Sequence, residues 1–158
     1  MNTRLQVEHP VTEAVTGLDL VAEQLRIAAG EPPSFVGAEV PEPRGHAIEF
    51  RVYAEDPKRF LPGPGAITAW EQPAGDGVRV DAGYEAGNTV TPFYDPLLAK
   101  LIVHGANRQD ALAKARVAVD EFTVVGPKNN LPFFAELLDN DEFVRGDYDT
   151  GLISRMRG

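Results

Sequence analysis

The chain has 158 residues, of which 43% are hydrophobic and 25% are charged, a composition typical of one globular domain. It contains no cysteine, which excludes a disulfide scaffold, a zinc finger and a thiol nucleophile and fits a cytoplasmic location. Twenty-four Asp and Glu against fifteen Lys and Arg give a net charge of −9, so nucleic acid and anionic membrane surfaces are poor partners. We find no run of about 18 apolar residues and no signal-peptide pattern, and we therefore expect no membrane association.

The first segment, residues 2–8, alternates apolar and polar side chains, which predicts a β-strand. Such a strand would place four polar side chains on one face, about 7 Å apart, namely Asn2, Arg4, Gln6 and Glu8. This row suits a small oxyanion, because Arg4 could grip it, Gln6 could donate a hydrogen bond and Glu8 could accept its proton. The alternative is a solvated strand face without a ligand, and spacing alone leaves both readings open.

Helical spacing of apolar residues and capping residues predict five helical segments. The first two are a short turn of helix between Pro10 and Gly17 and an amphipathic helix over 18–29. The third runs from the N-cap Asn107 to about Phe122, and the fourth from Asn129 or Asn130 to Leu138. The last is a short helix capped by Thr150 and ending near Arg155. Residues 31–45 are rich in proline and are expected to form an irregular connector.

Alternation and turn residues predict strands at 46–53, 67–70, 78–81 and 97–103, the last as a buried strand or a short helix–strand pair. In the first of these, Glu49 and Arg51 share the face opposite the apolar row. Arg51 could stabilise a developing enolate or carboxylate, and the alternative is a surface ion pair with Glu49. Strands joined by short turns indicate an antiparallel sheet, so the predicted fold class is α+β, an antiparallel sheet packed with helices.

Other polar and aromatic residues are assigned no chemistry. The three histidines, His9, His46 and His104, are far apart in the sequence, and we predict no metal site from them. The glycines at 63, 65, 83 and 87 lack the pattern of a phosphate loop and are interpreted as turns. Asp95 is interpreted as a helix cap, and the three aromatic residues Phe133, Phe134 and Phe143 as core.

Five segments, in this order and spacing, resemble the biotin carboxylase component of biotin-dependent carboxylases: MNTRLQVEHPVTE, HAIEFRVYAEDP, FLPGPG, YDPLLAKLIVHGANR and GPKNNLPF. The resemblance covers essentially the whole chain, and LQVEHPVTE is its most specific part. The segments YDPLLAKLIV and YDTGLISRMR are similar to the α-subunits of bacterial acyl-CoA carboxylases of the acetyl- or propionyl-CoA class.

The resemblance implies an enzyme that uses MgATP and bicarbonate to make carboxyphosphate and then carboxybiotin, as part of acyl-CoA carboxylation and fatty acid biosynthesis. It implies biotin and MgATP as cofactors of the whole enzyme, and a biotin carboxyl carrier domain and a carboxyltransferase subunit as partners. It also implies a homodimer contact, at the positions Glu71 to Arg79.

Residue roles follow from the same resemblance. Glu8 corresponds to the base that deprotonates bicarbonate, while Arg4, Gln6 and the backbone of Val7 correspond to the groups that hold the bicarbonate. Asn2 corresponds to a residue beside the magnesium and the phosphates. Arg51 corresponds to the arginine that stabilises the biotin enolate. The catalytic set implied for this chain is thus Glu8, Arg51 and Arg4.

The chain resembles only the last third or so of that enzyme. We expect residues 1–30 to be a remnant of the ATP-grasp lobe and 31–158 to be the C-terminal domain, with a robust core over 45–138. The glycine-rich phosphate loop, the ATP-binding lysines and a metal-binding glutamate of the family are missing. We therefore expect no turnover and no tight binding of biotin or MgATP by the chain alone. We expect residues 2–8 to be frayed, re-paired or used at a chain-to-chain contact. The alternatives are a non-enzymatic scaffold or dimerisation module and another ATP-grasp ligase, which LQVEHPVTE disfavours.

Overall fold

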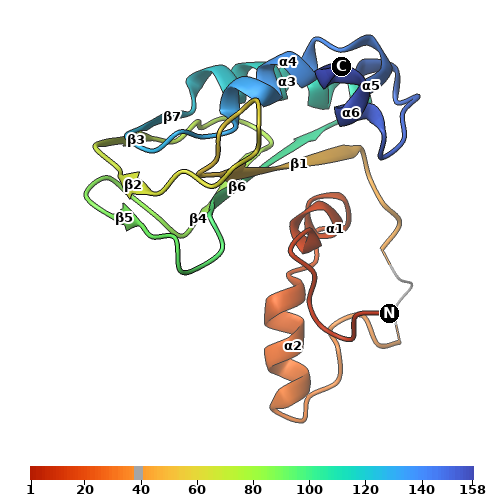
Figure 1. Cartoon of the computed structure of the whole chain (residues 1–158). Coiled ribbons are helices and arrows are strands. Elements are labelled where there is room, and N and C mark those ends of the chain that lie inside the picture. Colours follow the sequence, from red (N-terminus) through yellow and green to blue (C-terminus); the bar gives the residue numbers. More distant parts are fainter. Residues whose placement is uncertain (38–40) are drawn as a thin grey trace.

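The structure, a computed structural model, describes residues 1–37 and 41–158, and a three-stranded antiparallel sheet lies at its centre. The sheet consists of β1 (His46–Tyr53), β6 (Leu97–Gly105) and β4 (Val78–Ala82), in the order β1-β6-β4 (Figure 1). Two shorter antiparallel pairs accompany it: β2 (Gly65–Ala66) with β5 (Thr89–Val90), and β3 (Ala69–Glu71) with β7 (Thr123–Val125).

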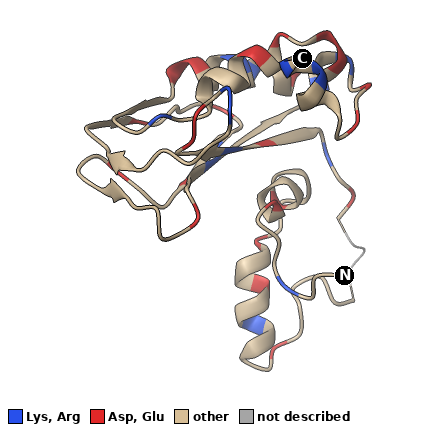
Figure 2. Ribbon diagram, in the orientation of Figure 1, with Lys and Arg blue, Asp and Glu red and all other residues tan. Residues whose placement is uncertain are grey.

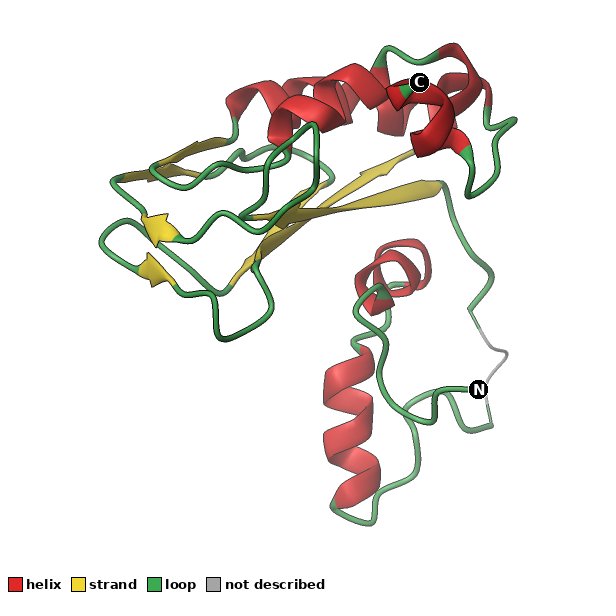
Figure 3. Ribbon diagram, viewed as in Figure 1, coloured by secondary structure: helices red, strands yellow, loops and turns green. Residues whose placement is uncertain are grey.

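Helices lie on both sides of this sheet, which confirms the predicted α+β class (Figure 3). One layer contains α3 (Arg108–Glu121), α4 (Leu131–Leu138), α5 (Asp141–Arg145) and α6 (Leu152–Arg157). On the opposite side, α1 (His9–Thr16) contacts β1 and β6, and α2 (Leu20–Ala28) follows it away from the sheet (Figure 1). Residues 31–37 and 41–45 contain no helix or strand, as predicted for the connector, while 38–40 lie outside the described residues.

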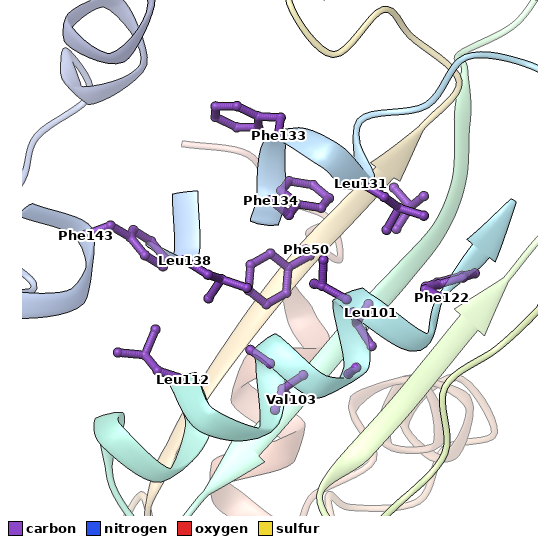
Figure 4. Packing of buried hydrophobic residues seen from close by; sticks show 14 of the residues in the cluster. Phe50, Leu101, Val103, Leu112, Phe122, Leu131, Phe133, Phe134, Leu138 and Phe143 are labelled. Carbon is purple, nitrogen blue, oxygen red and sulfur yellow. The ribbon is translucent and has the colours of Figure 1, made fainter. Parts of the chain in front are cut away.

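The hydrophobic core lies between the sheet and the α3–α4 layer (Figure 4). Leu101 of β6 is fully buried at its centre, directly opposite Phe50 of β1, and the Phe50 ring meets the Phe134 ring edge-on at 5.1 Å. The predicted aromatic core residues are therefore confirmed. The core extends past the expected limit at 138, because Phe143 of α5 and Leu152 of α6 are also buried in it.

The side chain of Asn130 joins the helical layer to strand β1. It is 4% exposed, its Oδ1 accepts a hydrogen bond from the Tyr53 backbone N–H, and its Nδ2 donates to the Arg51 carbonyl at 3.0 Å. Sequence reasoning assigned Asn129 or Asn130 as the cap of α4. Asn129 Oδ1 does accept the Leu131 N–H, whereas the Asn130 side chain makes no cap hydrogen bond and satisfies the exposed edge of β1.

We expect Asn130→Ala to destabilise the chain by about 2–4 kcal/mol, because two part-buried backbone groups of β1 and the Glu55 carboxylate would lose a partner. The free energy of unfolding from urea titration measures this loss. Asn129→Ala is the matched control, since it removes one hydrogen bond at a helix end and one to the Val124 carbonyl but none to β1, and it is expected to cost about 1 kcal/mol. Equal losses in the two variants would contradict the role assigned to Asn130.

Several predicted elements are corrected by the structure. Of the strand predicted at 67–70, only Ala69 and Trp70 lie in a strand, β3, while Ile67 and Thr68 separate β3 from the unpredicted β2. Sheet neighbours are not consecutive, since β1 pairs with β6. Asp95 caps no helix: its Oδ1 accepts the Leu97 N–H at the start of β6. Gly151, not Thr150, is the N-cap of the last helix. The pattern also missed α5, whose five residues are too few to establish a period.

The prediction of a strand at residues 2–8 is wrong. Among the described residues this segment pairs with no strand, and two of its polar side chains bind its own backbone instead: Arg4 donates to the Leu5 carbonyl and Gln6 to the Arg4 carbonyl. Glu8 then becomes the N-cap residue of α1, with φ −82° and ψ 10°. An alternating pattern makes a strand only where a neighbouring strand supplies backbone partners, and none is available here.

Candidate functional site

One face of the central sheet carries charged side chains rather than apolar ones. The cross-strand register aligns Arg51 and Asp81 on either side of Lys100, and Glu49 and Arg79 on either side of Ile102. Because side chains alternate along a strand, these residues share the face opposite the core. We call Glu49, Arg51, Arg79, Asp81 and Lys100 the charged face; Figure 2 shows both signs of charge along the strands of this sheet.

The N-terminal segment contacts the charged face through several polar interactions. The Glu8 carboxylate accepts a hydrogen bond from Arg51 Nη2 at 2.7 Å, and Lys100 Nζ lies 3.5 Å from the carbonyl oxygen of Val7. In α1, Glu13 accepts a hydrogen bond from Arg79 Nη1 at 2.7 Å. Residues separated by 43 to 93 positions in sequence are thus brought together at one place.

Arg79 and Asp81 form the most tightly bonded ion pair of this face. Arg79 binds both carboxylate oxygens of Asp81, at 2.7 and 2.8 Å, and Lys100 approaches the same carboxylate to 3.5 Å. Burial alone would raise the pKa of Asp81, but hydrogen bonding and charge from Arg79, together with Lys100, hold it below its usual value. Hydrogen bonds to the carboxylates of Asp81 and Glu13 in turn raise the pKa of Arg79 above its usual value. This geometry fixes α1 against β4.

Glu49 is the buried member of the charged face. Its side chain is 4% exposed, and Arg51 Nε lies 3.5 Å from its Oε1. Burial raises the pKa of Glu49 above its usual value, against the opposing positive charges of Lys100 and Arg51. The predicted pairing of Glu49 and Arg51 on one face is correct, but this face is covered by the N-terminal segment and is not simply solvated.

A hollow of about 530 Å³ lies between the N-terminal segment and α2, and Glu8 forms part of its lining. Its lining includes three of the predicted anion-binding residues, Arg4, Gln6 and Glu8. They come together here through a turn rather than in the straight row that a strand would have produced. Asn2 is exposed.

The structure thus unites Glu8 with Arg51 on one side and with Arg4 and Gln6 on the other. Sequence reasoning missed Lys100, Asp81 and Arg79 as neighbours of this site. Lys100 had a signal, because it is the single charge inside the otherwise apolar run LLAKLIV, and a charge in a buried strand needs a partner. No sequence signal marked Arg79 and Asp81 as part of a site, since alternating charges on a short strand are common on surfaces.

The turn glycines lie in the other half of the molecule. A Cβ built at Gly63 would meet Lys128, and one built at Gly65 would meet Pro127, so these residues pack in a turn rather than opening toward a phosphate. Within residues 1–37 and 41–158, no helix is both long and apolar enough to cross a bilayer. No group of three potential metal ligands lies in those ranges.

Comparison with known families gives matches to both ends of the chain. The model of the biotin carboxylase C-terminal domain matches residues 49–155, which include most of β1 and the α3–α6 layer as far as Arg155. The model of the carbamoyl-phosphate synthase L chain ATP-binding domain matches residues 1–34. The fold is therefore that of a biotin carboxylase C-terminal domain. The chain belongs to the biotin carboxylase C-terminal domain family.

Individual relatives agree with this assignment. Biotin carboxylase 2 of Bacillus subtilis is 50% identical over 98% of this chain, which corresponds to 35% of that protein. The biotin-dependent acyl-coenzyme A carboxylase alpha3 subunit of Mycobacterium leprae is 50% identical over 91% of the chain and 24% of its own length. The crystal structure of the 2-oxoglutarate carboxylase biotin carboxylase domain dimer of Hydrogenobacter thermophilus, with MgADP, ADP and bicarbonate, superposes with a TM-score of 0.94, at 39% identity, over 98% of this chain and 34% of that one. The chain spans about a third of the length of Bacillus biotin carboxylase 2.

Proposed function

We propose that this chain is the C-terminal part of a biotin carboxylase and supplies the bicarbonate base and the biotin-facing arginine of that enzyme. The observation that carries the proposal is the 2.7 Å contact between the Glu8 carboxylate and Arg51. Their side chains are 57% and 40% exposed, so substrates can reach both groups. The family match and the relatives named above give the reaction class.

In this proposal a bicarbonate ion occupies the hollow beside Glu8. Arg4 and Gln6 and the backbone of Val7 would hold its oxygens, and the Glu8 carboxylate would accept the proton of its O–H group. Arg51 binds Oε2 of Glu8, so in this proposal Oε1 would accept the proton of the bicarbonate. Asn2 would lie toward the magnesium and the phosphates.

Arg51 is the proposed biotin-binding residue. Its guanidinium is always charged and planar, and it would offset the negative charge that develops on the ureido group of biotin as the ring nitrogen loses its proton. When Glu8 accepts the proton of bicarbonate its carboxylate would turn from Arg51 toward that anion, which leaves both N–H groups of Arg51 Nη2 for the ureido oxygen. The 2.7 Å contact is therefore a resting arrangement of the two residues.

We propose that the described residues do not make a nucleotide site on their own. The glycines at 63 and 65 pack against residues 127 and 128, and the one implied residue beside the phosphates, Asn2, is exposed. We therefore propose that residues 1–30 are completed by a separate ATP-binding portion, that 31–158 form the C-terminal domain, and that the chain alone does not turn over. No step through MgATP is assigned to this chain.

The proposal extends to the partners and the metabolic context of the whole enzyme. A biotin carboxyl carrier domain and a carboxyltransferase subunit are the proposed partners, and the acyl-CoA class rests on the M. leprae relative. A second copy could bind at Glu71 to Arg79, although Arg79 is already bonded within the chain. The cysteine-free sequence supports the cytoplasm as its location, and acetyl-CoA carboxylation for fatty acid biosynthesis is the proposed context.

The experiment that tests this function measures biotin-dependent ADP release from MgATP and bicarbonate. The chain is assayed alone and then with the separately produced ATP-binding portion of B. subtilis biotin carboxylase 2. We expect no ADP release from the chain alone and measurable release on mixing. Activity of the chain alone would refute the claim that it lacks an ATP site of its own. Stable binding to the ATP-binding portion without activity would favour the scaffold or dimerisation module.

A further inference from the structure

We infer that Glu49 is the positioning residue of Arg51. Its carboxylate attracts the guanidinium at Nε and keeps it in place when Glu8 no longer binds Nη2. None of the assignments made above gives Glu49 a role. The catalytic part of the inference rests on the proposed function, whereas the contact between the two side chains does not.

The first observation is an unusual burial. Both carboxylate oxygens of Glu49 are shielded from solvent, and neither has a hydrogen-bond partner among the described residues. Burying a carboxylate without hydrogen bonds is costly, so a side chain that only stabilised the fold would be expected to be paired or apolar. This group needs another explanation.

The second observation is the arrangement of charges around Glu49. Arg51 on the same strand and Lys100 on β6 are the cations that act on its carboxylate, and Glu8 from the N-terminal segment is the neighbouring anion. Arg51 Nε is 3.5 Å from Glu49 Oε1, while Arg51 Nη2 is 2.7 Å from Glu8 Oε2. Two carboxylates therefore share one guanidinium and hold it at different nitrogens.

The two carboxylates differ in what they can do next. Glu8 is 57% exposed at the edge of the hollow and can turn to a ligand, whereas Glu49 is fixed within a strand and is 4% exposed. When Glu8 takes up a proton or a ligand, the charge of Arg51 loses its closest partner. Glu49 is then the nearest remaining counter-charge, and the 3.5 Å separation can shorten to a full hydrogen bond.

The contact is tested by NMR on the ¹⁵N-labelled 158-residue chain, through solvent exchange of the Arg51 Nε–H. We expect Glu49→Gln to speed this exchange about tenfold or more, because a charge-assisted contact is replaced by a neutral one. Glu8→Gln should leave it within about threefold, since Glu8 binds the terminal nitrogen. Glu55→Gln is the matched control: Glu55 is another part-buried glutamate, bonded to Asn130, and should have no effect. Faster exchange in Glu8→Gln alone would overturn the inference.

A second measurement does not depend on the Glu49→Gln variant folding. Burial raises the pKa of Glu49, and Arg51, Lys100 and Glu8 are the charged groups that face it. Arg51→Met should therefore raise the pKa of Glu49 further, as followed by ¹³C NMR of the carboxyl carbon. An unchanged titration in Arg51→Met would show that the two side chains do not interact and would overturn the inference.

The catalytic consequence is measured in the mixed enzyme. Glu49→Gln should lower kcat about tenfold and leave KM for MgATP within about twofold, because only the position of Arg51 is affected. If Glu49→Gln speeds the Nε–H exchange but leaves kcat unaltered, the inference that Glu49 matters for catalysis is overturned. If the wild-type mixture shows no activity, the proposed function fails, while the NMR results still decide the contact.

Discussion

Replacing Glu8 by Gln in the mixed enzyme should lower kcat by about 10²–10⁴-fold. The amide keeps the size of the side chain and a hydrogen bond to its surroundings, but it cannot accept the proton of bicarbonate. KM for MgATP should change little, because Glu8 faces Arg51 and the hollow lined by Arg4 and Gln6. The rate of biotin-dependent ADP release at saturating bicarbonate measures the effect.

Glu31→Gln is the control for this experiment. Glu31 lies in the same N-terminal part of the chain and is 61% exposed, in a loose 3.8 Å ion pair with Arg26. Its replacement should leave kcat unchanged. A kcat for Glu8→Gln within about threefold of wild type would show that another group is the base.

Leu101→Ala should destabilise the chain by about 3–5 kcal/mol, one of the largest effects open to a single substitution here. Leu101 has no exposed surface and sits in the middle strand of the sheet, opposite Phe50 and Val80. Strands on both sides and the α3–α4 layer limit how far the structure can collapse into the space left behind. The free energy of unfolding from urea titration measures the loss.

Val117→Ala in α3 provides the comparison, because the Val117 side chain is 58% exposed and its truncation should cost less than about 0.5 kcal/mol. A loss below about 1 kcal/mol for Leu101→Ala would contradict the central place of Leu101 in the core. Such a result would mean that the sheet and the helical layer can close the gap.

The charged face explains why the N-terminal segment stays on the sheet without pairing as a strand. Arg79 bonds to Glu13 in α1, and Lys100 approaches the Val7 carbonyl, so the contact is made by side chains rather than by a backbone ladder. Most of these groups are partly exposed, and each pair contributes modestly. Their joint effect is to set Glu8 above Arg51, which is what the proposed chemistry requires.

Much of the molecule could be predicted because the determining interactions are local. The alternation from His46 to Tyr53 reproduces the bounds of β1, and Asn107 caps α3 as expected, its Oδ1 accepting the Asp110 N–H. The LQVEHPVTE segment indicated the family, which the family model matched. In each case the signal lies within a few residues, where period and capping chemistry act directly.

The remaining features depend on contacts between distant segments. Residues 2–8 alternate as a strand would, yet they form none, since a strand needs a neighbour that the alternation cannot supply. Asn130 sits at a helix start but bonds to β1. The sequence by itself determined the main strands β1, β4 and β6, every helix except α5, the apolar rows and the identity of Glu8 and Arg51 as candidates. Only the tertiary structure decided that Glu49 is buried behind Arg51 and that Lys100 lies beneath Val7, because burial and long-range pairing are properties of the packed chain.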